Sequence, residues 1–226
     1  MNFYIDFDNT LYNTKTLTAE MLDSIATYIS QTQEIAKDDI LLQLKAKFNR
    51  ENIYNIFTLC EYFEKKYNIE NQILQHKIKQ ILINGYKYVY EDVPEFLENL
   101  KKHNHTLSIL TAATGTDNID YQGLKVYSSG ITKYFNNIII TTEPKDKLDL
   151  VYSNGIFIDD NPDELRNLCN ANAKKVIRIK RPGAKYSSQI INNSSNSNAQ
   201  KYNIDEYTSL SEIKFNYEKK SEILCK

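Results

Sequence analysis

The sequence predicts an α/β fold with a doubly wound, mostly parallel sheet. Short apolar runs bounded by polar residues recur along the chain, and longer segments with helical spacing separate them. The runs are continuous instead of alternating, which is typical of strands buried on both faces of a parallel sheet. Strand and helix therefore alternate in the order that a doubly wound sheet needs. We expect strands at residues 3–5, 107–110, 138–140, 156–158 and 176–179.

Two of the separating segments carry clear helix signals. Residues 92–103 place four apolar side chains on one face, and residues 162–173 begin with a proline, which suits the first helical turn. Residues 187–203 contain five serines and five asparagines and are expected to form a polar surface loop.

A long helical segment interrupts the alternation after the first strand. Residues 14–87 contain no convincing strand, no proline and a single glycine, Gly85, and their apolar residues have helical spacing. We expect helical hairpins or a small bundle here, inserted as a cap domain. The third of its four expected helices contains Ile53, Ile56, Phe57 and Cys60. Residues 1–13 and 88–226 would then form the α/β core.

Composition restricts the classes of partner and compartment. The chain has 226 residues with 41% hydrophobic and 25% charged side chains, and its formal net charge is −1. This balance gives no electrostatic reason to expect nucleic acid or a membrane surface as a partner. The three cysteines are scattered, the first ten residues lack the basic start of a signal peptide, and the apolar runs fall short of the ~18 residues of a membrane span. We expect a cytoplasmic protein.

Acidic residues follow two of the predicted strands directly. Asp6 and Asp8 come after the first apolar run, and Asp159 and Asp160 come at the end of the run that begins at Gly155. In a parallel sheet the carboxyl ends of the strands share one edge, where ligands bind. Four carboxylates at one edge would repel one another, and a divalent cation is their natural counter-ion. All-oxygen ligands favour Mg²⁺, with substrate phosphate oxygens completing the shell.

Each motif alone has a simpler explanation. An isolated D-x-D is most often a turn or a helix cap, and paired acids after a strand often cap the next helix. Both motifs together, at two strand ends, favour chemistry. The charged residues Lys180, Arg181 and Lys185, after the last expected strand, are interpreted as an ordinary surface loop.

Four segments resemble, in order, the signatures of the haloacid dehalogenase-like (HAD) superfamily. The first is FYIDFDNTLY, which matches an apolar strand followed by D-x-D-x-T. The others are LSILTAATG, with a strand ending at Thr111, TTEPKDKLDLV, with a lysine at a helix start, and GIFIDDNPDEL, with paired acids. The first and fourth are quite specific. The resemblance implies a Rossmann-like core, and the helical insertion matches the family's cap placed after strand one.

The resemblance also implies roles for the first two signatures. Asp6 would attack phosphorus and form an aspartyl-phosphate. Asp8 would protonate the leaving alkoxide and then deprotonate the attacking water, and its backbone carbonyl would bind the metal together with Asp6. Thr111 and the backbone N–H of Ala112 would hydrogen-bond the phosphoryl group.

The remaining roles fall on the third and fourth signatures. Asp160 would ligate Mg²⁺, and Asp159 would orient or assist it. A lysine would neutralise charge on the nucleophile and on the phosphoryl oxygens. Lys147 is the first choice for this lysine because it lies closer to the fourth signature, and Lys145 remains the alternative.

The resemblance implies a Mg²⁺-dependent phosphatase that acts on a small phosphorylated metabolite. Asp8 favours this activity, because members that displace halide need no acid for the leaving group and lack aspartate there. A phosphomutase or nucleotidase of the same superfamily stays open, as does a receiver-like signalling domain or a non-catalytic phosphate-binding module. Nothing in the sequence names the substrate or the oligomeric state.

Overall fold

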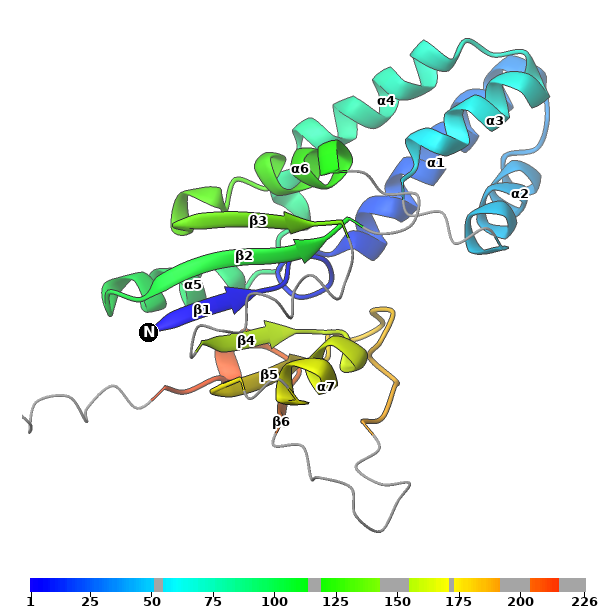
Figure 1. The fold of residues 1–226 in the computed structure, drawn as a ribbon. Coiled ribbons are helices and arrows are strands. Elements are labelled where there is room, and N and C mark those ends of the chain that lie inside the picture. The colour runs from blue at the N-terminus through cyan, green and yellow to red at the C-terminus, as the bar shows by residue number, and fades with distance from the viewer. Residues whose placement is uncertain (51–54, 114–118, 143–154, 171–172, 192–203, 216–226) are drawn as a thin grey trace, which may run out of the picture.

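The chain folds around a six-stranded sheet in which every neighbouring pair is parallel (Figure 1). The structure is a computed structural model that describes residues 1–50, 55–113, 119–142, 155–170, 173–191 and 204–215. The spatial order is β3-β2-β1-β4-β5-β6. The strands are β1 (Asn2–Ile5), β2 (Thr106–Ala112), β3 (Asn137–Thr141), β4 (Ile156–Asp159), β5 (Lys175–Ile179) and β6 (Ile204–Tyr207).

The first strand lies at the centre of the sheet. In the register, Ile5 of β1 stands opposite Ile109 of β2 on one side and Ile158 of β4 on the other. The five expected strands and the doubly wound parallel architecture are confirmed. The strand β6 and a helix between β2 and β3 were not expected from the sequence.

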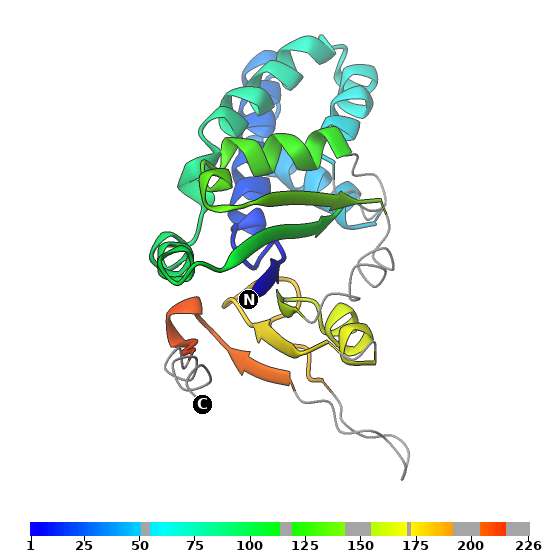
Figure 2. The same ribbon diagram turned by 60° about the vertical axis from the view of Figure 1, so that its left-hand side comes forward.

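Helices cover both faces of the sheet (Figure 2). One face packs against α5 (Val93–Lys102) and α6 (Ile119–Ser128), and its apolar side chains join one large core cluster. The other face packs against α7 (Pro162–Asn170), through a smaller cluster that includes Leu110, Phe157 and Leu165. Continuous apolar strands are needed because each strand must fill two cores at once.

Among the described residues, four helices follow β1 before the chain returns to the sheet, and they lie together beside α6 in Figure 1. They are α1 (Thr14–Gln33), α2 (Lys37–Arg50), α3 (Phe57–Tyr67) and α4 (Asn71–Ile83), and a 3₁₀ turn, η1 (Gly85–Tyr88), follows. The third helix begins at Phe57, and the Asn55 side chain, two residues earlier, accepts a hydrogen bond from the Phe57 N–H at 3.0 Å. That these helices form a separate cap domain stays a prediction.

The chain leaves the sheet and returns to it along neighbouring backbone segments. The Asn13 N–H donates to the Tyr88 carbonyl at 2.7 Å, and the Tyr90 N–H donates to the Leu11 carbonyl at 3.2 Å. Gly85 is required by a close approach, because a Cβ at that position would lie 2.3 Å from the Ser128 hydroxyl and 3.0 Å from the Ser128 backbone. Within the described residues, no helix has the length and hydropathy to cross a membrane.

A buried ion pair ties the returning segment to the end of β5. The Arg181 guanidinium donates to both carboxylate oxygens of Asp92, at 2.7 and 2.9 Å, and to the Thr10 carbonyl at 3.1 and 2.9 Å. It also lies 4.1 Å from the centre of the Tyr90 ring. The interpretation of Arg181 as a surface residue was therefore wrong, since its side chain is 5% exposed. The cause is tertiary: its partners come from segments about 90 and 170 residues away.

Loss of this ion pair should destabilise the fold. Asp92→Ala would leave a buried guanidinium without its counter-ion, so we expect the free energy of unfolding to fall by about 3 kcal/mol in urea denaturation at pH 7. Asp205→Ala is the matched control, because Asp205 pairs with Lys175 at 2.9 Å on the surface. Its loss should stay below about 1 kcal/mol. Equal losses in the two variants would contradict the structural importance of the Arg181 pair.

The same pair predicts a loss of stability in acid. Burial opposes ionisation of Asp92, but hydrogen bonds from Arg181 and Ser209 outweigh it and hold the pKa of Asp92 below its ordinary value of 3.8. The folded state has the lower pKa. The stabilisation is therefore fully present above the ordinary value of 3.8 and is lost as the pH falls through the pKa of the folded state. The unfolding free energy, measured from pH 6 to pH 3, should decline less steeply in Asp92→Asn than in the wild type. Parallel plots of unfolding free energy against pH for the two proteins would contradict the acid-dependent role of Asp92.

Candidate active site

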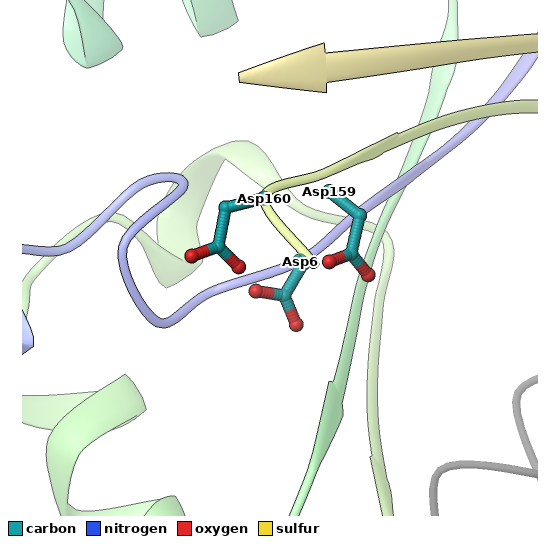
Figure 3. A group of neighbouring side chains, drawn as sticks. All are labelled: Asp6, Asp159 and Asp160. Atoms are coloured by element: carbon teal, nitrogen blue, oxygen red, sulfur yellow. The ribbon is translucent and has the colours of Figure 1, made fainter. Parts of the chain in front are cut away.

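Three buried carboxylates meet at the carboxyl edge of the sheet (Figure 3). Asp6 follows β1, Asp159 ends β4, and Asp160 comes next. One oxygen from each lies within 4.8 Å of the others, and all three side chains are buried. The backbone brings them together, because the Asp6 N–H donates to the Ile158 carbonyl at 2.8 Å and so continues the pairing of β1 with β4.

The acid cluster fits a divalent cation by its chemistry. Buried carboxylates at this spacing repel one another unless a positive charge lies among them. An all-oxygen donor set suits a hard cation such as Mg²⁺, which takes one or two carboxylates and retains water or phosphate oxygens. Asp159 is also oriented by the protein, since its carboxylate accepts a hydrogen bond from the Asn161 N–H at 2.8 Å.

The fourth predicted acid, Asp8, has a different environment. Its carboxylate accepts hydrogen bonds from the Thr14 hydroxyl and from Gln122 Nε2, and Lys125 Nζ lies 3.0 Å from each of its oxygens. Burial alone would raise the pKa of Asp8, but the charge of Lys125 and these hydrogen bonds outweigh burial and hold the pKa below its ordinary value. The protein therefore supplies the positive charge for Asp8 itself.

Thr111 is joined to Asp8 through one side chain. Its hydroxyl oxygen accepts a hydrogen bond at 2.9 Å from Gln122 Nε2, the same nitrogen that donates to Asp8 at 2.6 Å. Thr111 is buried near the end of β2, and Ala112 is the last residue of that strand. The two predicted lysines, Lys145 and Lys147, lie outside the described residues.

Gln122 and Lys125 were not predicted from the sequence as site residues. Both lie on α6, a helix that was not expected, and both are almost fully buried, at 0% and 2% exposure. A signal was present: the buried stripe of α6 consists of Tyr121, Gln122, Lys125 and Val126, at helical spacing. An amide and a lysine on the buried face of a helix require polar partners inside the protein.

A comparison with protein families identifies the class. Residues 4–151, about two thirds of the chain, match the family of haloacid dehalogenase-like hydrolases. With the doubly wound sheet described above, this match shows that the chain belongs to that family. The matched range contains Asp6, Asp8 and Thr111 and ends before Asp159 and Asp160, which the structure brings to the same edge. No curated protein matches the chain.

Solved structures show the same fold at low sequence identity. A HAD phosphatase from Thermococcus onnurineus is 17% identical, with a TM-score of 0.57, over 93% of this chain and 94% of that one. A HAD hydrolase from Bacillus subtilis, bound to magnesium, is 16% identical, with a TM-score of 0.57, over 93% and 95%. An L-2-haloacid dehalogenase from Xanthobacter autotrophicus is 15% identical, with a TM-score of 0.52, over 93% and 95%. These neighbours share the fold and differ in the reactions that their names state.

The acid cluster predicts stabilisation by Mg²⁺. A cation that binds only the folded state, at about 100 times its dissociation constant, should add about 2.7 kcal/mol, which corresponds to a rise of roughly 5–10 °C in Tm. Asp160→Ala should abolish the rise, because few oxygens of the chain could replace the lost ligand. Asp163→Ala, an exposed acid on α7, is the control. An equal rise in Asp160→Ala would contradict the site.

Proposed function

We propose that the chain is a Mg²⁺-dependent phosphatase that hydrolyses a small phosphomonoester through an aspartyl-phosphate on Asp6. The observation that carries the proposal is the environment of Asp8. A second acid stands two residues after the proposed nucleophile and is linked through Gln122 to Thr111, the proposed phosphate-binding residue. A halide departs without a proton, whereas an alkoxide leaving group needs one. An acid held at this place therefore favours a phosphate ester over a haloacid as substrate.

Each half of the reaction has a residue to perform it. In the first, a carboxylate oxygen of Asp6 attacks phosphorus, the bond from phosphorus to the ester oxygen breaks, and Asp8 gives its proton to the departing alkoxide. In the second, water attacks the phosphorus of the aspartyl-phosphate, Asp8 accepts the proton of that water, and inorganic phosphate leaves with Asp6 restored. The donors around Asp8 favour its ionised form, which suits the second half. The negative charge of a bound phosphate favours the protonated form that the first half needs.

The acid cluster and Thr111 would hold the phosphoryl group. Asp6, Asp160 and the backbone carbonyl of Asp8 would ligate Mg²⁺, with Asp159 orienting the set. When bound, Mg²⁺ supplies positive charge that offsets the repulsion between the phosphate and the carboxylates. The Thr111 hydroxyl and the Ala112 N–H would donate to the phosphoryl oxygens, and Lys147 or Lys145 would add positive charge.

Phosphate release from a panel of phosphorylated metabolites tests the proposal. We expect at least one ester to be hydrolysed with Mg²⁺ and none with EDTA. Asp6→Asn removes the attacking charge at constant size, so the rate should fall by about 1,000-fold or more while the fold survives. Asp163→Asn, at an exposed acid, is the matched control.

Chloride release from 2-chloropropionate is measured in a parallel assay, because a structural neighbour is a dehalogenase. Chloride release without any phosphate release would overturn the proposal in favour of a dehalogenase. The absence of turnover on every ester, including p-nitrophenyl phosphate, would also overturn it and would favour a receiver-like or phosphate-binding module.

A further inference from the structure

We infer that Gln122 and Lys125 of α6 are positioning residues that hold Asp8 in place for protonation of the leaving group. The inference deepens the proposed phosphatase function and rests on it. It starts from the observation that the Asp8 carboxylate is held from three side chains of two helices, Thr14 at the start of α1 and the α6 pair.

Lys125 fixes the plane of the carboxylate. Its ammonium lies 3.0 Å from both oxygens of Asp8, so a rotation of the carboxylate about its own axis would lengthen at least one of these contacts. The Lys125 side chain is 3% exposed. A protein with an apolar side chain of similar size at such a position is often as stable as one with a buried ion pair, or more stable. A contribution to packing alone therefore does not explain a lysine here.

Gln122 fixes the distance between Asp8 and Thr111. The carboxylate can only accept, so the amide must turn its Nε2 toward Asp8, and the second hydrogen of the same group goes to the Thr111 oxygen. This orientation leaves the buried Oε1 without a hydrogen-bond partner among the described residues, which is a cost. The unpaired Oε1 lowers the stability of the folded state, while Nε2 connects Asp8 to Thr111 near the end of β2.

The same contact sets the direction of the Thr111 hydroxyl. Because the Thr111 oxygen accepts from Gln122, its own hydrogen points away from the amide and can be donated elsewhere. In the proposed reaction the Thr111 hydroxyl would donate this hydrogen bond to a phosphoryl oxygen. Gln122 would therefore align both the group that holds phosphate and the group that protonates the departing oxygen.

Comparing kcat/KM for two esters distinguishes a positioning role of Gln122 and Lys125 from a purely structural role. The alkoxide of glycerol 2-phosphate needs a proton as it leaves, whereas the phenolate of 2,4-dinitrophenyl phosphate does not. The value of kcat/KM covers the steps up to departure of the alcohol or phenol, so hydrolysis of the aspartyl-phosphate does not enter it. Displacement of Asp8 should therefore lower kcat/KM for the first ester far more than for the second.

We expect Lys125→Met and Gln122→Leu each to lower kcat/KM by about 100-fold on glycerol 2-phosphate and by less than about fivefold on the dinitrophenyl ester. Lys102→Met, at an exposed lysine that ends α5, is the matched control and should change neither value. Thermal unfolding verifies that each variant is folded, and if one is not, the other decides.

The outcomes distinguish the two levels of the proposal. Equal losses on both esters, or no loss on either, would overturn the positioning role while the phosphatase function stands. A wild-type chain that hydrolyses neither ester nor any member of the metabolite panel would overturn the phosphatase function, and the positioning role would fall with it.

Discussion

The parallel pairing of β1 with β2 on one side and β4 on the other is the constraint on which the site depends. With Ile5 opposite both Ile109 and Ile158, the residues that follow these strands reach one edge at the same height. Asp6 and Asp159 then become neighbours although about 150 residues separate them. A slip of one residue in either pairing would exchange the inner and outer faces of a strand and move these acids away from each other. The apolar runs on both sides of the sheet make such a slip costly, because each face fills a separate core.

Four carboxylates lie at or near this edge, and two kinds of positive charge suit them. Asp6, Asp159 and Asp160 form a buried cluster whose chemistry suits a cation taken from solution. Asp8 has a cation from the chain itself, because Lys125 spans both of its oxygens. The charge of Lys125 favours the ionised form of Asp8, and the negative charge of a bound phosphate would favour the protonated form. In the proposed reaction the acid cluster would ligate Mg²⁺ and supply the nucleophile, Asp6, and Asp8 would act as acid and base.

Most of the sheet could be predicted from the sequence because its strands are short, apolar and continuous. The signal fails at the edge and in α6. The strand β6, IDEY, pairs only with β5 and follows a segment rich in serine and asparagine, so its pattern is that of a loop. The helix α6 carries Gln122 and Lys125 on its buried face, and such residues blur the apolar stripe that identifies a helix. Arg181 was assigned to the surface because composition alone cannot reveal that Thr10 and Asp92 surround it.

The acids of the site could be predicted because they follow strands directly, whereas the groups that orient them come from helices. Thr14, the first residue of α1, donates to Asp8, and Gln122 and Lys125 of α6 contact the same carboxylate. The two helices also touch, since the Tyr121 hydroxyl lies 3.8 Å from the Met21 sulfur, and the Tyr121 ring packs edge-on against Phe57 of α3 at 5.7 Å. A displacement of α1 relative to α6 would therefore alter the contacts of Asp8, so the position of the helical region is coupled to the geometry of the acid.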